Sequence, residues 1–438
     1  MSRIKLIIFV LLITAGCSTL SNLIAEKDSS PKLTGERITV LKLENDLIAN
    51  TQMKDVNIML PLQLDNSAWS NSNGSEYNYP ENLKLAPIKS CHSNSLGFSQ
   101  KTYTNSTPVI ANGIIFVMGN KASVLAFKID NLSKPIWTKN TMPLDEKEEY
   151  IGGGMVTTHD KLFVTAGHRD VVALNMHNGK EIWRHSLNNI IRSAPILSQN
   201  ILFVVTIDNK LYAIDSVSGS VIWMHEGANE SIGIFGSASI AADSNVVVIP
   251  HSSGQLHGLN LKTGEKLWSV NLAFNKNSLM GFSFSDIDIT PIIRNNIVYV
   301  AGNTGSVYAI NLKNGTPLWH KNIKGIRSLW VAGNFLYVIN DYNELIAIYN
   351  QNGQIKWVNN LQPETNNKSS SKLQSFGPIL ANDLLLFTTN IGKLLFVSPY
   401  DGKIVREMPI SKNVYSLPIV VSSKLFIISN NGTLSICE

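Results

Sequence analysis

Short apolar runs recur along the chain, separated by polar turns that contain Gly, Asn or Asp. Each run has four residues, mostly aliphatic or aromatic, which is typical of a buried β-strand. The runs occupy residues 124–127, 171–174, 211–214, 256–259, 307–310, 345–348, 394–397 and 434–437. Runs of this kind at a repeated spacing predict an internal repeat with eight copies.

Tryptophan follows most of these runs and marks the same repeat. It stands at positions 137, 183, 223, 268, 319 and 357, in steps of 38 to 51 residues. Five of these six tryptophans lie four residues after a glycine, namely Gly179, Gly219, Gly264, Gly315 and Gly353. In the seventh copy Arg406 takes the tryptophan place. Because Gly and Asn adopt positive φ at low cost, these turns are suited to joining neighbouring strands.

Each copy contains four strand patterns. An opening strand often starts with Pro, as at Pro195 and Pro291, and a β-branched and aromatic strand such as 297–300 follows. The apolar run and the tryptophan strand complete the copy. Four short strands in each repeat of this length are typical of a propeller blade. The sequence therefore predicts an all-β fold, an eight-bladed β-propeller of four-stranded antiparallel blades, over residues 83–438.

The last copy reaches Glu438 without an outer, tryptophan-type strand. A ring leaves no strand edge open only if the missing strand comes from elsewhere. We expect residues 83–91 to supply it, so that an N-terminal strand closes the propeller. Residues 61–82 are expected to pack irregularly against the ring, and the polar, aperiodic residues 17–60 to form a tether.

The N-terminus has the layout of a secretory signal peptide, which we assign to residues 1–16. Arg3 and Lys5 precede an apolar run at 6–13 that is too short to span a bilayer. Residues 14–17, which end in Cys17, resemble the bacterial lipobox. This resemblance implies cleavage before Cys17 and acylation of its sulfur and its new amine. The alternative is an ordinary signal peptide in which Cys17 has no such role.

Composition narrows the class of protein further. The formal net charge is +5, too weak a bias to indicate nucleic-acid binding. A hydrophobic share of 44% and a charged share of 16% indicate a globular rather than a disordered chain. Three cysteines exclude a disulfide-dense scaffold and a four-cysteine zinc site.

The repeat, Asn/Thr-Gly-x-x-x-Trp with a strand of the type x-Tyr-Ala-Ile, resembles the PQQ-type β-propeller repeat, most specifically at residues 285–291 and 303–312. With the lipobox, and with residues 35–41, the chain resembles the BamB family of outer-membrane assembly factors over residues 33–438. The resemblance implies a non-enzymatic scaffold without a cofactor, anchored by lipid to the periplasmic face of the outer membrane. Its implied partner is the periplasmic part of BamA, the β-barrel insertase, and its implied role is to help outer-membrane proteins fold.

The resemblance also implies a contact surface with two parts. An Asp-x-Asp pair is matched by Asp286 and Asp288, whose carboxylates share one face of an extended segment and favour a basic partner or a metal. The alternative is a solvated or turn-capping acidic pair. An apolar-x-apolar-Arg-Gly loop is matched by Ile232 and Ile234, but Phe235 replaces the arginine. That removes a charge-assisted contact, although an aromatic residue can anchor an interface; the alternative is packing inside the ring.

Two rival functions use the same fold: a PQQ-dependent quinoprotein dehydrogenase, and a propeller that binds a small molecule or glycan in its channel. Fold alone does not decide between them. The quinoprotein enzymes resemble one another in a metal with carboxylate and amide ligands, and often in two adjacent cysteines. Here Cys17, Cys91 and Cys437 are far apart, which favours a scaffold. His251 and His257 lie six residues apart across a hairpin turn, and this pattern does not favour a metal site.

A disulfide between Cys91 and Cys437 is attractive in an oxidising periplasm. The expected register argues against it, because Cys91 aligns four residues past the tryptophan place whereas Cys437 aligns with core positions of the apolar runs. The hairpin would then separate the two Cα atoms by roughly 17 Å along the strand, and a disulfide requires about 7 Å or less. We therefore expect the two thiols to stay unpaired.

Overall fold

The computed structural model describes residues 47–78, 80–97, 106–143, 145–146, 153–191, 193–227, 239–251, 253–272, 289–302, 305–362 and 373–438. These residues belong to one compact unit that begins at Leu47. Cys17 and the predicted signal peptide lie outside the described residues. No helix among the described residues is long and apolar enough to cross a membrane.

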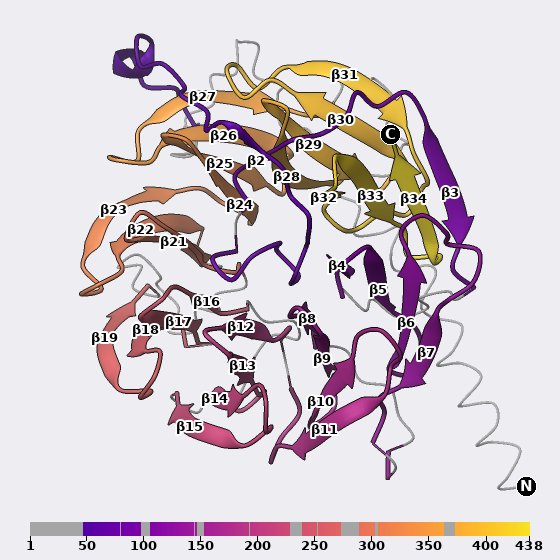
Figure 1. The fold of residues 1–438 in the computed structure, drawn as a ribbon. Helices are drawn as coiled ribbons and strands as arrows, with labels where there is room; N and C mark the ends of the chain where they lie inside the picture. Colours follow the sequence, from indigo (N-terminus) through magenta and orange to yellow (C-terminus); the bar gives the residue numbers. More distant parts are fainter. Residues whose placement is uncertain are drawn as a thin grey trace, which may run out of the picture. The chain divides into compact units, whose positions relative to one another are not determined.

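The described strands form eight sheets, which follow one another around a common centre (Figure 1). The first three sheets contain β4 (Val109–Ala111), β5 (Ile114–Met118), β6 (Ser123–Lys128) and β7 (Trp137–Asn140); β8 (Gly154–Thr157), β9 (Lys161–Thr165), β10 (Asp170–Asn175) and β11 (Glu181–Ser186); and β12 (Ile196–Ser198), β13 (Ile201–Val205), β14 (Lys210–Asp215) and β15 (Val221–Glu226). The next three contain β16 (Ala241–Ala242), β17 (Val246–Pro250), β18 (Gln255–Asn260) and β19 (Lys266–Asn271); β20 (Ile292–Arg294), β21 (Ile297–Gly302), β22 (Ser306–Asn311) and β23 (Pro317–Asn322); and β24 (Ile326–Ala332), β25 (Phe335–Asn340), β26 (Glu344–Tyr349) and β27 (Ile355–Asn360).

The last two sheets each include strands from the N-terminal part of the chain. One contains β28 (Ser375–Ala381), β29 (Leu384–Thr389), β30 (Lys393–Val397) and β31 (Ile404–Pro409), to which β1 (Gln63–Leu64) and β2 (Asn82–Leu83) add in parallel. The other contains β32 (Ile419–Val421), β33 (Lys424–Ile428), β34 (Thr433–Cys437) and β3 (Cys91–Ser95). The fold is thus an all-β propeller with four-stranded antiparallel blades. Seven of the sheets have the predicted make-up of four strands, and the sheet with six strands departs from it.

The core lies between neighbouring sheets, as the apolar runs require. Phe116 of the first sheet and Val172 of the second belong to one buried cluster, and both are almost fully inaccessible to solvent. The largest cluster joins Ile115 of the first sheet to Phe426 of the sheet that contains the C-terminus. Burying a side chain of this size stabilises the fold by roughly 1.5–3 kcal/mol. The sheets are therefore held together by face-to-face apolar packing.

Five tryptophans of the repeat each connect their own sheet to the following one. Trp268 on β19 donates its indole N–H to the backbone oxygen of Leu312, 2.7 Å away in the following sheet. The same bond links Trp137 to Met176, Trp183 to Ser216, Trp223 to Leu261 and Trp319 to Asn350. These five Trp residues are structural, because the ring fills the gap between sheets while its indole N–H is satisfied by a backbone oxygen of the next sheet.

The closing strand differs from the expected one. We expected residues 83–91 to pair with the last apolar run, but the strand is β3, which starts at Cys91. Cys91 lies opposite Cys437, so His92 rather than a residue further upstream takes the tryptophan place. Residues 82–83 instead form β2, next to β28. The error arises because β3 is polar and carries no tryptophan to fix its register.

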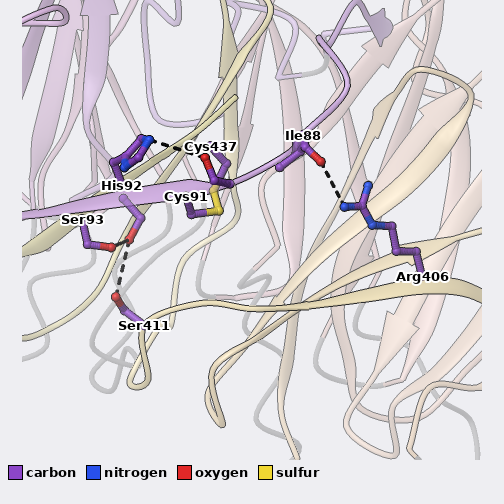
Figure 2. Close-up of a disulfide and its surroundings, with 9 residues drawn as sticks. Ile88, Cys91, His92, Ser93, Arg406, Ser411 and Cys437 are labelled. Carbon is purple, nitrogen blue, oxygen red and sulfur yellow. Dashed lines mark hydrogen bonds between the residues drawn. A yellow bond between two sulfur atoms is a disulfide. The ribbon is translucent and has the colours of Figure 1, made fainter.

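Because β3 has a different register from the expected one, the prediction that Cys91 and Cys437 stay unpaired is wrong. Cys91 and Cys437 form a disulfide, with Cα atoms 4.0 Å apart (Figure 2). Ser93, two residues further along β3, hydrogen-bonds through its hydroxyl to Ser435, with an O–O distance of 2.7 Å. A strand from one end of the chain is thus tied covalently to the other end.

The described N-terminal segment is packed on the propeller before residue 61, where we had expected a tether. The short 3-10 helix η1 (Thr51–Met53) is capped by Asn50, whose side chain accepts a hydrogen bond from the Gln52 amide. Lys356 of β27 donates to the backbone oxygens of Met53 at 2.9 Å and Val56 at 2.7 Å. A lysine in the place that other copies give to an apolar residue is the sequence signal for this contact.

Residues 66–78 then run past the inner strands of several sheets. The backbone N–H of Ser422 donates to Asn66, and Trp69 exchanges two backbone hydrogen bonds with Ile110. Further along, the N–H groups of Thr157, Ala242 and Ile293 donate to the backbone oxygens of Ser70, Glu76 and Tyr77, respectively. This segment therefore lies across inner strands that are far apart in the sequence.

Candidate functional site

The two motifs expected to bind a partner belong to two successive connections between sheets. Residues 228–238 join β15 to β16, and residues 273–288 lie between β19 and β20. Ile232, Ile234 and Phe235 of the first connection, and Asp286 and Asp288 of the second, lie outside the described residues. Their placement is not tested, but the strands that follow them are described.

The bases of the two connections are in direct contact. The chain is described again from Ser239, four residues after Phe235, and from Ile289, directly after Asp288. The backbone N–H of Ser239 donates to the Thr290 hydroxyl at 3.2 Å. The Ser239 hydroxyl in turn donates to the backbone oxygen of Ala194, at 3.1 Å. The two motifs, about fifty residues apart in the sequence, therefore lead into adjoining strands.

Asn78 of the N-terminal segment holds these two bases together. Its side-chain amide donates to the backbone oxygens of Ile240, at 2.8 Å, and Pro291, at 3.0 Å. Asn78 is buried and has a φ of 61°, a conformation that Asn tolerates better than most residues. A buried amide with both donors satisfied fixes the spacing of the residues that follow Ser239 and Thr290.

A cavity of about 200 Å³ opens beside this contact. Asn78 and Thr290 line it on one side, and Arg327 and Trp330 of β24 line it on another. Arg327 donates to the backbone oxygen of Asn340 at 3.0 Å and to the Asn343 side chain at 2.8 Å. Burial lowers the pKa of the Arg327 guanidinium. The Nε and Nη2 groups of Arg327 thus donate to protein acceptors, and these bonds stabilise the turn after β25.

Three histidines meet at the junction between the sheets β12–β15 and β16–β19. The sequence did not favour a metal site at His251 and His257, because it did not show that His225 joins them from the preceding sheet. Burial lowers the pKa of His257 to about 4, and the charges of His225 and Lys266 act in the same direction. Burial, followed by the charge of Lys266, also lowers the pKa of His225. Both imidazoles are therefore held neutral near pH 7.

The repeat that builds these junctions matches a known family. The family model described as "Outer membrane protein assembly factor BamB" matches residues 134–359, just over half of the 438 residues. The chain belongs to the BamB family. The matched stretch includes both connections described above and the whole tri-histidine junction.

Curated relatives cover most of the chain. An uncharacterised protein of Rickettsia prowazekii (strain Madrid E) is 29% identical over 335 residues, which cover 75% of this chain and 79% of that protein. BamB of Yersinia pestis is 22% identical over 341 residues, which cover 76% of this chain and 84% of that protein. BamB of Escherichia coli (strain K12) is 21% identical over 337 residues, with the same two shares, 76% and 84%.

Solved structures share the fold at lower identity. The crystal structure of BamB from Moraxella catarrhalis has a TM-score of 0.66 at 16% identity and covers 80% of this chain and 100% of that one. A quinohemoprotein alcohol dehydrogenase from Comamonas testosteroni has a TM-score of 0.61 at 13% identity, with 84% and 80% covered. At these identities the likenesses show the fold alone, so they do not separate a scaffold from an enzyme.

Proposed function

We propose that this chain is a non-enzymatic scaffold lipoprotein of the outer-membrane β-barrel assembly machinery. In this proposal it docks on the periplasmic domains of BamA and assists the folding and insertion of outer-membrane proteins. Membership of the BamB family, through a match that spans both sheet connections, carries the proposal. Lipid attached to Cys17 would hold the chain at the outer membrane, facing the periplasm.

The hydrogen bond between Ser239 and Thr290 supports a single docking surface. This bond joins the residues that lead into β16 to those that lead into β20. The first group follows Ile232, Ile234 and Phe235, and the second follows Asp286 and Asp288. We propose that these five residues contact BamA together, with Phe235 as an apolar anchor and the carboxylates paired with basic groups of BamA. Aromatic anchors near charged partners are common where a few residues dominate binding.

We also propose that the eight sheets act as eight blades of one closed ring. The cluster that joins Ile115 to Phe426 supports continuous packing across the junction between the first and last sheets. The pairing of β3 with β34 supports closure by an N-terminal strand. An experimental structure with a different number of blades would contradict this.

The alternative is a propeller that binds a ligand or PQQ and acts in redox chemistry. The fold shared with the quinohemoprotein alcohol dehydrogenase is compatible with it. The described cavity of about 200 Å³ is small for this role, since pockets for cofactor-sized ligands hold about 300–1,000 Å³. Asn73 and Asn78 of the N-terminal segment also line that cavity. We therefore favour the scaffold.

The test is an affinity pull-down of the full-length tagged chain from detergent-solubilised envelopes, with partners identified by mass spectrometry. We expect BamA with the wild-type chain and at least a tenfold loss with the double variant Asp286→Lys, Asp288→Lys. A Cys17→Ala variant should leave the membrane fraction without losing its binding to purified BamA periplasmic domains.

The matched control is the double variant Asp130→Lys, Asp160→Lys, which makes the same charge change at two exposed turn positions next to other sheets. It should recover BamA as well as the wild type does. Equal recovery by both double variants would reject the assignment of the acidic pair. Recovery of the chain alone, with a coloured cofactor, would replace the scaffold with the redox alternative.

A further inference from the structure

Three imidazole nitrogens converge at one junction between sheets. His225 lies on β15, His257 lies on β18, and His251 directly follows β17. Nδ1 of His257 lies 3.1 Å from Nε2 of His225 and 3.1 Å from Nε2 of His251. All three nitrogens lie within 4.8 Å of one another, and His251 and His257 are buried.

Hydrogen bonds among the three rings do not account for this arrangement. Nε2 of His257 faces the side-chain oxygen of Gln255 at 3.2 Å, so this nitrogen carries the proton and donates it. Nδ1 of His257 is then the acceptor, with a single in-plane lone pair. Two nitrogens at 3.1 Å compete for that lone pair, which serves one N–H well and not two. A metal ion bound between the rings would accept a lone pair from each of the three nitrogens, so that the nitrogens would no longer compete for one acceptor.

A divalent transition metal fits the spacing. Zinc binds imidazole nitrogen at about 2.0–2.1 Å, and two ligands of a tetrahedral ion are then about 3.3–3.4 Å apart. The two separations of 3.1 Å in the structure are slightly shorter than this edge. We propose that His225, His251 and His257 form a three-imidazole site for a divalent transition metal, for which Zn²⁺ is the test ion.

The surroundings of the rings are those of a built site. Gln255 accepts from His257 and fixes which nitrogen faces the other two, as outer partners of metal-bound histidines do. Gly227 leaves room for the His251 ring, because a Cβ at that position would lie 2.3 Å from its Nδ1. Lys266 places a positive charge near His225 and His257, which opposes the binding of a cation.

The ligands come from both sides of the junction, so a bound metal would tie one sheet to the next. His225 belongs to the sheet β12–β15, whereas His251 and His257 belong to the sheet β16–β19. Trp223, two residues before His225, makes the ordinary contact of the repeat across the same junction, to Leu261. Three protein ligands leave a fourth position for water or for a ligand from a partner, next to the partly exposed His225.

The preceding junction provides a matched control. His185 follows Trp183 by two residues, as His225 follows Trp223, and it is also partly exposed. Tyr212 stands there in the place of His257, because the two residues precede Ala213 and Gly258 in paired strands of the same register. His185 therefore has the position of His225 without a comparable partner on β14.

The experiment uses the full-length chain, purified with a tag that contains no histidine, stripped with a chelator and dialysed against Zn²⁺. We expect one bound zinc per chain by elemental analysis for the wild type and for His185→Ala. We expect His225→Ala to bind at least tenfold more weakly. Co²⁺ in place of zinc should give the visible absorption of a four-coordinate ion in the wild type and not in His225→Ala.

His225 is the residue to change because it is partly exposed, so its loss leaves the buried core intact. The circular dichroism spectrum of each variant checks that it is folded. Zinc should also raise the melting temperature of the wild type and of His185→Ala, and not that of His225→Ala. Equal zinc affinity of the His225→Ala and His185→Ala chains, or no zinc bound by the folded wild type, would overturn the site.

Discussion

Gly353 lies directly against the indole ring of Trp319, which belongs to the preceding sheet. A Cβ atom at Gly353 would lie 2.7 Å from Cε3 of that ring, whereas packed carbon atoms stay about 3.5–4.0 Å apart. The Trp319 indole N–H donates to the backbone oxygen of Asn350, at 2.8 Å, in the same turn. The turn that contains Asn350 and Gly353 therefore packs against the Trp319 ring and also accepts the hydrogen bond of its indole N–H. The same contact joins Gly179 to Trp137, Gly219 to Trp183, Gly264 to Trp223, Gly315 to Trp268 and Gly402 to Trp357.

Gly353→Ala should therefore destabilise the propeller by about 3 kcal/mol. About 1–2 kcal/mol of this comes from an L side chain at a φ of +73°, and the rest from displacement of the Trp319 ring. The change in urea-induced unfolding, followed by tryptophan fluorescence and circular dichroism, measures the loss.

Gly113→Ala separates the two causes. Gly113 has nearly the same φ, +72°, but a Cβ there would meet nothing within 4 Å. It should cost only the backbone part, about 1–2 kcal/mol. Losses of equal size at Gly353 and Gly113 would show that contact with Trp319 contributes nothing.

The repeat was the part of the fold that the sequence predicted best. Its signal is local, because a turn glycine, a tryptophan four residues later and an apolar run all belong to one copy. What the sequence did not show is that each glycine packs on the tryptophan of the preceding copy. That contact depends on how copies stack, which no spacing within one copy records.

The sequence correctly predicted that an N-terminal strand pairs with the last apolar run, but it predicted the wrong register for that strand. The strand β3, Cys-His-Ser-Asn-Ser, has neither the tryptophan nor the apolar alternation that fixed the other copies. Its placement is set by the pairing of Cys91 with Cys437 and by Ser93 with Ser435. Arg406 of the neighbouring sheet adds a long-range contact, since its guanidinium donates to the backbone oxygen of Ile88 at 3.0 Å (Figure 2).

Loss of the disulfide should weaken closure of the propeller strongly. The two cysteines are 346 residues apart, and the entropy of so long a loop gives a stabilisation of up to about 5 kcal/mol. We expect Cys91→Ser to lower the melting temperature and to make residues near β3 the first to exchange their amide hydrogens. Alkylation of denatured, unreduced wild-type protein should leave Cys91 and Cys437 unmodified.

Ser93→Ala is the matched change on the same strand. It removes the hydroxyl contact with Ser435 and leaves the disulfide, so it should cost about 1 kcal/mol. Alkylation of both cysteines in unreduced protein, or equal effects of the two variants, would contradict a disulfide that closes the ring.

For the candidate sites, too, the sequence showed the motifs within one copy but not the contacts between copies. The motifs at 232–235 and 286–288 are visible in the sequence, but the contact between Ser239 and Thr290 that relates them is not. His251 and His257 were noticed as a pair, whereas His225 joins them only through the stacking of one sheet on the next. The register of the repeat could have indicated His225, because it places the second residue after Trp223 at the junction between the two sheets.

Lys356→Met should release the segment around η1 from the propeller while the sheets stay folded. The Lys356 ammonium donates to three backbone oxygens of that segment, those of Met53, Lys54 and Val56, at 2.7–3.3 Å. Methionine keeps much of the apolar stem but donates nothing, so three acceptors lose a charge-assisted bond. We expect faster amide exchange and easier proteolysis in residues 47–60, with a fall of less than about 1 kcal/mol in global stability. Lys313→Met, at an exposed turn of another sheet, should leave both readouts unchanged. If residues 47–60 are protected equally in the wild type and in Lys356→Met, other contacts such as that of the Asn50 amide with the Ile355 oxygen hold the segment in place.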